Sequence, residues 1–198
     1  MDQAVTHPYF ANDPRSMRQR MEAGDLYLAE DAELAVASQQ AITAAHRYGQ
    51  LWPEDRDAAE LLLAELIGSL GEGVEIRPPL FVDYGRYITI GPGTFINYNF
   101  TALDVAPITI GADVMIGPNV QLLTPTHPLD SRLRRDKLEA AKPITIGDNV
   151  WLGGGVIVLP GVTIGENTVV GAGSVVTRDL PPNVVAVGNP ARISKELA

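Results

Sequence analysis

Residues 144–176 read ITIGDNVWLGGGVIVLPGVTIGENTVVGAGSVV, a stretch in which apolar residues return every six positions. We call these positions the ladder, and in this stretch they hold Ile146, Leu152, Val158, Ile164, Val170 and Val176. Ile, Leu and Val together fill 52 of the 198 positions, so six matches in one chosen register arise by chance roughly 3 times in 10,000. The stretch is a hexapeptide repeat, and its period decides the fold.

The ladder continues toward the N-terminus, and two further positions keep step with it. Its earlier members are Ile90, Ile96, Ile110, Ile116 and Leu122. An apolar residue stands two positions before many ladder residues, at Ile88, Ile108, Val114, Ile144, Val150, Val156 and Val162. A glycine directly follows seven of the ladder residues, at Gly91, Gly111, Gly117, Gly147, Gly153, Gly165 and Gly171. The repeat therefore dominates the chain from about Val74 onward.

A period of six predicts one short strand and one turn per repeat. We expect one apolar side chain per strand to point inward, and the glycine to serve a corner where a positive φ is needed. Three hexapeptides make one triangular coil, and stacked coils bury a column of Ile, Leu and Val. A sandwich of ordinary strands would show a period of two and irregular turn spacing. The sequence predicts a mainly β fold, a parallel β-helix, for which the crossover rule alone would favour right-handed coils.

Two segments break the ladder. The longer one, Leu123–Lys142, contains Thr126-His127-Pro128 and then a basic cluster of Arg132, Arg134, Arg135 and Lys137. The shorter one, Thr101–Pro107, adds two residues to the register and holds Asp104. A polar excursion of this length from a compact domain is typical of a functional loop. Four basic residues in a loop are, in contrast, more often only a solvated face.

The N-terminal part of the chain has helical periodicity. We expect residues 1–15 to be an extended or poorly ordered arm. Three helices follow: one from Ser16 to Gly24, one from Asp31 to Gly49, and one from Pro53 to Gly71. The predicted division is an arm (1–15), a helical cap domain (16–72) and a β-helix domain (73–198) with an excursion loop (123–143). The helical part is thin for an independent core, so it should pack against the β-helix.

Composition and charge exclude several classes of protein. The formal net charge of −9, from 15 basic and 24 acidic residues, gives no electrostatic footprint for nucleic acid. No apolar run is long enough to span a bilayer, and no signal peptide is visible, so we expect no membrane partner. The absence of cysteine excludes disulfides and a cysteine nucleophile, and it fits a cytoplasmic protein.

Several runs of residues resemble those of the maltose/galactoside O-acetyltransferases, a family of the hexapeptide-repeat acyltransferase superfamily. Met21-Glu22-Ala23-Gly24-Asp25-Leu26-Tyr27 looks like the start of the family's helical domain. The other runs are Thr126-His127-Pro128, Asn149-Val150-Trp151-Leu152-Gly153, Pro160-Gly161-Val162-Thr163-Ile164-Gly165 and Gly188-Asn189-Pro190-Ala191-Arg192. Together these runs are specific, and the match covers nearly all of the chain after the first 15 residues.

The resemblance implies a left-handed β-helix, a homotrimer, and active sites in the clefts between subunits. It also implies acetyl-CoA as the donor, a small sugar or glycoside as the acceptor, and no required metal. By position, His127 matches the catalytic histidine. The acceptor-pocket positions are Asp83, Asn97 and Asp104, with Asp31 as a possible acid from the helical domain. The CoA-contacting positions are Gly154, Ala172, Thr177, Arg192 and Lys195.

The chain departs from the family's pattern at a few of these positions. Relatives often have Ser at Gly154 and Arg at Lys195, so a hydroxyl and a guanidinium are missing. In some relatives the acid near Asp104 falls one residue later, where this chain has Val105. Trp151 could pack along the pantetheine arm or simply cover the solenoid. Arg192 and Lys195 could bind CoA phosphates or belong to a solvated tail.

A single histidine is sufficient for direct acyl transfer. A neutral imidazole can take the proton from a hydroxyl as its oxygen attacks a thioester. The developing oxyanion needs a backbone N–H, and Gly153-Gly154-Gly155 would allow close approach. Asp104 could orient His127 or bind the sugar. If His127 is not the base, Asp83, Asp104 and Glu139 are the next candidates.

Three other functions compete with the sugar O-acetyltransferase. One is the same chemistry on a xenobiotic or antibiotic hydroxyl, which the Gly24-Asp25-Leu26-Tyr27 run of the helical domain disfavours. A γ-class carbonic anhydrase needs three metal-binding histidines, whereas the β-helix here holds only His127. A non-catalytic hexapeptide scaffold would not need His127 or the long excursion.

Overall fold

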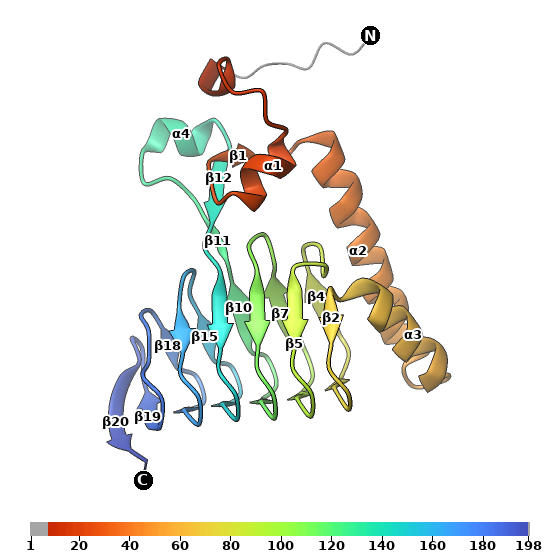
Figure 1. Ribbon diagram of the computed structural model, residues 1–198, viewed down its shortest axis with the longest axis vertical. Helices are drawn as coiled ribbons and strands as arrows, with labels where there is room; N and C mark the ends of the chain where they lie inside the picture. The colour runs from red at the N-terminus through yellow and green to blue at the C-terminus, as the bar shows by residue number, and fades with distance from the viewer. Residues whose placement is uncertain (1–7, 198) are drawn as a thin grey trace.

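The computed structural model describes residues 8–197, so the first seven residues of the predicted arm lie outside it. The chain forms a solenoid of parallel strands, with helices over its N-terminal end (Figure 1). The helices are η1 (Pro8–Phe10), α1 (Met17–Glu22), α2 (Ala32–Leu51), α3 (Arg56–Leu66) and α4 (Ser131–Arg135). None of the helices in this described part is long and apolar enough to cross a membrane.

The solenoid has three faces, and each face is one sheet. Face one contains β2 (Ser69–Leu70), β5 (Ile88–Ile90), β8 (Ile108–Ile110), β13 (Ile144–Ile146) and β16 (Thr163–Ile164). Face two contains β3 (Glu75–Ile76), β6 (Phe95–Ile96), β9 (Met115–Ile116), β14 (Trp151–Leu152), β17 (Val169–Val170), β19 (Val184–Val187) and β20 (Arg192–Glu196). Face three contains β4 (Leu80–Val82), β7 (Phe100–Leu103), β10 (Gln121–Leu123), β15 (Ile157–Val158) and β18 (Val175–Val176). The left-handed parallel β-helix predicted from the repeat and the resemblance is confirmed.

Ladder residues stack on one another from coil to coil. On face one, Ile90 lies beside Ile110, Ile110 beside Ile146, and Ile146 beside Ile164. All are at most 1% exposed. The residues two positions earlier are also buried, including Ile108, Ile144 and Val156. The expectation of one inward side chain per strand holds for two-residue strands such as β15, where Val156 is buried in the preceding turn. Three-residue strands such as β8 and β13 contribute two.

Glycine is required directly after the ladder residues for a different reason from the one expected. None of these glycines has a positive φ, which instead occurs three residues after the ladder, as at Gly93 and Asn149. The glycines after the ladder lie where successive coils approach closely. A Cβ on Gly91 would lie 2.6 Å from the backbone nitrogen of Ala112. The side chain is absent there to allow coil stacking, not to allow a turn.

The N-terminal elements differ from the predicted boundaries in three places. Residues 8–15 are not an extended arm, because Arg20 pairs with Asp13 at 2.8 Å and lies over the ring of Phe10. Helix α2 continues two residues past Gly49, since packing against β4 and α3 outweighs the modest helix penalty of glycine.

The third helix is shorter than predicted at both ends. It begins after Asp55, whose side chain accepts a hydrogen bond from the backbone of Ala58, and Pro53 precedes it. It ends at Leu66, because Leu70 pairs with Ile90 in the first coil of the solenoid. The β-helix therefore starts at Ser69, inside the segment predicted to be helical.

The helices share two cores with the solenoid. Ala45, Tyr48 and Leu63 of α2 and α3 join the main core that fills the coils. A second, smaller cluster contains Met21 and Tyr27 and joins them to the excursion through Ala141. Figure 1 shows the result: α2 runs from beside α1, above the solenoid, to α3 at the first coil. This arrangement holds Ala29 and Glu30, which precede α2, beside His127.

Candidate active site

A small antiparallel sheet outside the solenoid positions His127. Its order is β1 (Tyr27–Leu28), β12 (Leu138–Ala141) and β11 (Pro125–Thr126). Tyr27 lies opposite Glu139, and Thr126 lies opposite Ala140. Continuing that register by one residue places His127 beside Glu139. Three neighbouring strands therefore bring Tyr27, Glu139 and His127 into one row.

The side chains of this row contact one another. The hydroxyl of Tyr27 donates a hydrogen bond to Oε1 of Glu139. The other carboxylate oxygen, Oε2, lies 3.8 Å from Nδ1 of His127. Tyr27 is fully buried, whereas the side chain of His127 is 59% exposed. Burial and the hydrogen bond to Glu139 raise the pKa of Tyr27, so it stays a neutral donor. The row holds a carboxylate at one ring nitrogen of an imidazole that faces solvent.

Asp104 does not contact His127; it is fully buried and holds a turn. Its carboxylate accepts hydrogen bonds from the backbone nitrogens of Asp83 (3.0 Å), Tyr84 (2.8 Å) and Tyr87 (3.2 Å). Burial raises its pKa, and these backbone hydrogen bonds oppose that rise. Asp104 therefore acts on the site by fixing the turn that carries Asp83.

Asp83 belongs to an acidic group near the row. Burial, together with the nearby Asp104 and Glu139, raises the pKa of Asp83 to about 7. Burial and the charges of Asp83 and Glu139 also raise the pKa of Tyr84. The structure therefore places two of the predicted acceptor-pocket acids, Asp83 and Asp104, on the same side of the solenoid as His127.

The pocket at His127 includes residues that the sequence did not single out as site residues. Its volume is about 380 Å³, and its lining is Ala29, Glu30, His127, Arg134, Lys137 and Glu139. Asp31 is not part of this lining, and its carboxylate caps α2 by accepting from the backbone of Glu33 and Leu34. The acid that the helical part brings to the pocket is thus its neighbour, Glu30. The antiparallel pairing across the excursion, which creates this pocket, has no signature in the hexapeptide pattern.

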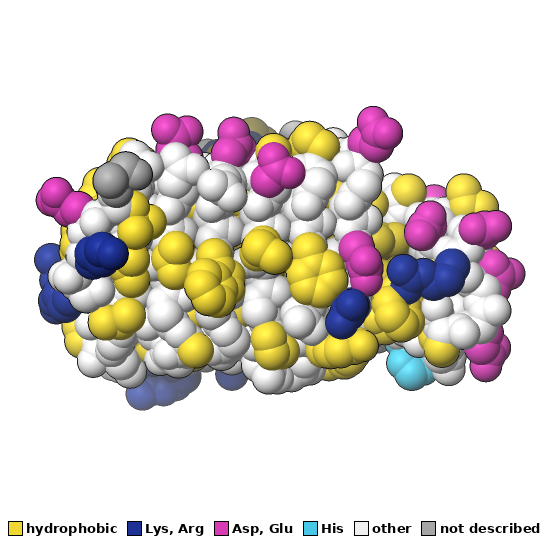
Figure 2. Space-filling view, turned by 90° about the horizontal axis from the view of Figure 1, so that it is seen from below, with side chains coloured by type: hydrophobic (Ala, Val, Ile, Leu, Met, Phe, Trp, Pro, Cys, Tyr) yellow, Lys and Arg dark blue, Asp and Glu magenta, His cyan; other side chains and the backbone are white. Residues whose placement is uncertain are grey.

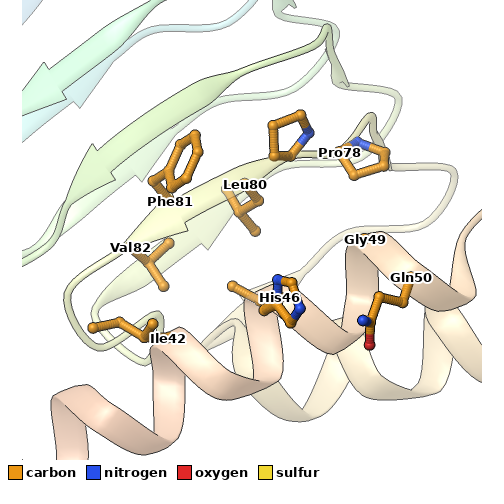
Figure 3. A pocket seen from close by; sticks show the side chains of 10 residues that line it. Ile42, His46, Gly49, Gln50, Pro78, Leu80, Phe81 and Val82 are labelled. Carbon is orange, nitrogen blue, oxygen red and sulfur yellow. The ribbon is translucent and has the colours of Figure 1, made fainter.

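A larger cleft of about 540 Å³ lies between α2 and β4 (Figure 3). Figure 3 shows His46 from the helix facing Leu80 and Phe81 of the strand. Its lining is mostly apolar and contains neither His127 nor a carboxylate. We place the candidate site at the smaller pocket, because only that pocket combines an imidazole with acidic and basic side chains.

The predicted positions divide between two edges of the solenoid. Asp83, Asp104 and the excursion follow strands of face three, and so does Thr177; we call this edge the histidine edge. Asn97, Gly154 and Ala172 follow strands of face two, and we call that edge the glycine edge. Within one chain, face three separates the two groups. A single chain therefore does not bring all predicted residues together.

Asn97 follows the ladder residue Ile96 and has no positive φ; the left-handed corner residue of this coil is Asn99. Its side-chain oxygen accepts a hydrogen bond from the backbone of Tyr98 at 2.8 Å. Gly154 and Ala172 follow each other in successive coils, where the nitrogen of Gly173 donates to the carbonyl oxygen of Gly154 at 2.9 Å. This edge exposes backbone with little side chain.

The remaining predicted cofactor residues lie on face two. Arg192 and Lys195 belong to β20, which pairs antiparallel with β19 at the end of the solenoid, and both are exposed. Trp151 is 55% exposed and lies in register with Met115. Figure 2 views the molecule from the side opposite the excursion and shows a row of hydrophobic side chains along the solenoid.

Comparisons with known proteins agree with this fold. Residues 143–178 match the family described as bacterial transferase hexapeptide (six repeats), and residues 20–71 match the maltose acetyltransferase hexapeptide capping motif. A galactoside O-acetyltransferase of Escherichia coli is 40% identical over 181 residues, which cover 91% of this chain and 89% of that protein.

Solved structures give the same result. A maltose O-acetyltransferase from Clostridium difficile is 42% identical with a TM-score of 0.91, over 93% of this chain and 98% of that one. A hexapeptide-repeat-containing acetyltransferase from Vibrio cholerae, solved with acetyl coenzyme A, is 41% identical with a TM-score of 0.86. That match covers 93% of this chain and all of the other.

Proposed function

Since the chain belongs to the maltose/galactoside O-acetyltransferase family of hexapeptide-repeat acetyltransferases, we propose that it moves the acetyl group of acetyl-CoA directly onto a hydroxyl of a small sugar or glycoside. The observation that carries this proposal is the row of Tyr27, Glu139 and His127 at a pocket of about 380 Å³. The relatives named above are described as acting on galactosides and maltose, and one was solved with acetyl coenzyme A.

His127 is the general base of the proposed reaction. Glu139 lies at Nδ1, which leaves Nε2 to take the proton from the acceptor hydroxyl. The hydroxyl oxygen then attacks the thioester carbonyl, and the carbonyl oxygen becomes an oxyanion. Collapse of this intermediate breaks the carbon–sulfur bond, and the imidazolium returns its proton to the CoA thiolate. No acyl-enzyme is needed.

Glu139 is a positioning residue in this proposal. Its carboxylate, held by Tyr27, stabilises the imidazolium that forms when His127 takes the proton. The contact of 3.8 Å is longer than a hydrogen bond, and such contacts often shorten when substrate binds. Glu139 would act through His127 and not on the substrate.

The glycine edge is the proposed binding surface for acetyl-CoA. The partly exposed Gly154 and the exposed Ala172 offer backbone that suits an extended pantetheine arm, and a free N–H there could hold the oxyanion. Arg192 and Lys195 are exposed cations for the CoA phosphates. Because this edge lies away from His127 in one chain, we propose a homotrimer in which each site joins edges of two subunits. Function in the cytoplasm is part of the same proposal.

Replacing the histidine tests the mechanism directly. We expect His127→Ala to lower kcat by about 10²–10⁴-fold, the usual contribution of a positioned base, with little change in acetyl-CoA affinity. Glu139→Gln should lower kcat less and leave KM for the acceptor nearly unchanged. The measurement is thiol release from acetyl-CoA with a panel of sugar acceptors.

His46→Ala is the matched control, because His46 lines the cleft between α2 and β4. This variant should keep full activity. The mechanism is refuted if His127→Ala folds, binds acetyl-CoA and still transfers acetyl at a near-native rate. A wild-type protein that binds acetyl-CoA but transfers to no acceptor would point to the scaffold function instead.

A further inference from the structure

Lys137 has a backbone conformation that is unusual for its side chain. Among residues 8–197, seven residues other than glycine have a positive φ; six are Asn or Asp, and the seventh is Lys137 at 63°. Asn and Asp tolerate this region because their short polar side chains bond to nearby backbone. Lysine has no such compensation, and glycine would adopt the conformation freely. The backbone at Lys137 therefore gives no local reason for a lysine, so its surroundings need to be considered.

The side chain of Lys137 reaches the pocket at His127, together with that of Arg134. In the described part of the chain, neither residue forms an ion pair within 4.0 Å, and Lys137 has no side-chain hydrogen bond. Arg134 donates from Nη1 to the carbonyl oxygens of Pro128 (2.8 Å) and Leu129 (3.1 Å). It therefore fixes the backbone after His127 while its positive charge stays uncompensated at the pocket.

The two carboxylates of the pocket lining, Glu30 and Glu139, equal these two cations in number but differ in what they contact. Glu139 is held by Tyr27 and lies beside His127, and Asp130 caps α4 and contacts Arg132. Asp136 accepts a hydrogen bond from the hydroxyl of Tyr9. Glu30 is the one lining carboxylate with no ion pair within 4.0 Å in residues 8–197. Because Glu139 is engaged by Tyr27 and His127, two lining cations and one lining carboxylate remain without an ion pair among the described residues and could contact an acceptor.

We propose that Lys137, with Arg134, makes the enzyme select an acceptor sugar that carries a carboxylate or a phosphate near the hydroxyl that is acetylated. This inference rests on the proposed function. Arg binds such groups bidentately and Lys binds them as a point charge. Acetyl transfer leaves the charged group unchanged, so it serves only recognition. Lys137 is therefore a specificity-determining residue.

Matched acceptor pairs test the proposal. Methyl glucoside is compared with methyl glucuronide, and glucose with glucose 6-phosphate, at low ionic strength and saturating acetyl-CoA. We expect kcat/KM to be about tenfold or more higher for at least one charged member, which corresponds to about 1.4 kcal/mol. The carboxylate and phosphate arms show which anion fits. Lys137→Gly should remove most of this preference, mainly through KM.

Three variants separate recognition from folding. Lys137→Gly relaxes the backbone, so its melting temperature should stay the same or rise while the preference is lost. Glu30→Gln removes the opposing charge and should increase the preference. Arg135→Ala is the matched control: Arg135 is an exposed cation of the same helix outside the pocket lining, so the preference should persist.

Three results would overturn the proposal. In the first, neutral and charged acceptors react equally well. In the second, Lys137→Gly lowers activity on both by the same factor. In the third, Lys137→Gly changes KM for acetyl-CoA instead, which would mean that Lys137 binds the donor and not the acceptor. If no acceptor reacts at all, the proposed function fails. Calorimetry of methyl glucuronide binding to wild type and Lys137→Gly then still decides the role of Lys137.

Discussion

At the scale of single residues, Asp83 shows how the acidic group near His127 should affect stability. Its pKa of about 7 in the folded protein lies well above its ordinary value of 3.8. Between these values the folded state keeps a proton that the unfolded state has lost. Raising the pH from 4 to 7 therefore favours the unfolded state, and the free energy of unfolding falls.

We expect Asp83→Asn to remove this pH-dependent fall in the free energy of unfolding. A shift of one pKa unit corresponds to about 1.4 kcal/mol, so wild type should lose roughly 2–4 kcal/mol relative to the variant between pH 4 and pH 7.5. Urea unfolding at both pH values and one protein concentration measures the difference. Glu65→Gln, an exposed position on α3, should follow wild type. Parallel pH dependence of wild type and Asp83→Asn would contradict the argument.

The sequence could predict His127 but not the residues that surround it. His127 stands in a polar excursion from a regular ladder, which isolates it as a candidate. Glu139, Tyr27 and Glu30 enter the site through antiparallel pairing of β1, β12 and β11. That register depends on how the excursion folds back on the helical segment, and local pattern does not encode it. The sequence points to Asp31 and not to its neighbour Glu30, because a capping acid and a binding acid look alike in a sequence.

At the scale of strands and helices, the hexapeptide repeat predicted how the coils stack, because each ladder residue lies beside a ladder residue of the next coil. Apolar periodicity did not distinguish helix from strand where the two meet. Leu66, Ile67 and Leu70 fit either pattern, so the end of α3 and the start of β2 could not be separated. In the structure the chain passes very close to the next coil between these two elements, since a Cβ on Gly68 would lie 2.1 Å from the carbonyl oxygen of Arg86.

The two kinds of glycine in each coil should respond differently to substitution. A Cβ on Gly91 would meet backbone atoms of Gly111 and Ala112 at 2.6 Å, so Gly91→Ala should force the coils apart. Gly73 has a φ of +72° and open space around it. We expect Gly91→Ala to lower the free energy of unfolding by about 3 kcal/mol or more, because the added methyl group overpacks the coil contact. Gly73→Ala should lower it by about 1–2 kcal/mol, because alanine disfavours the left-handed conformation.

Gly73→Asn distinguishes these causes, because Asn accepts the left-handed region and already fills the equivalent corner at Asn149. This variant should cost less than Gly73→Ala in denaturant unfolding. Equal losses for Gly91→Ala and Gly73→Ala would mean that backbone conformation, and not coil contact, sets the need for glycine.

At the scale of the whole molecule, two features indicate that one chain is incomplete. The histidine edge and the glycine edge lie on either side of face three, so a chain cannot supply both to one substrate. Face two also exposes Met115 (59%) and Trp151 (55%), which lie in register with each other, and Figure 2 shows a row of hydrophobic side chains along the solenoid. Exposed apolar rows of this kind are typical of interfaces. Cyclic closure would join unlike edges of neighbouring chains.

Hybrid trimers test this arrangement. His127→Ala and Asn97→Ala each remove one side of the proposed site, so each homotrimer should be inactive or nearly so. In a hybrid, a site is intact when one subunit supplies His127 and its neighbour supplies Asn97. Every trimer that contains both variants has one intact site of three, whatever the order of its subunits, so isolated hybrids should recover about one third of wild-type activity. Co-expression with two affinity tags isolates the hybrids, and light scattering gives their mass.

Mixing the two purified homotrimers without subunit exchange is the control and should restore nothing. If both residues of a site came from one chain, every chain in a hybrid would carry a defect in its own site. Hybrids of trimer mass that stay inactive would therefore reject the shared site, and an active wild-type monomer would reject the trimer itself.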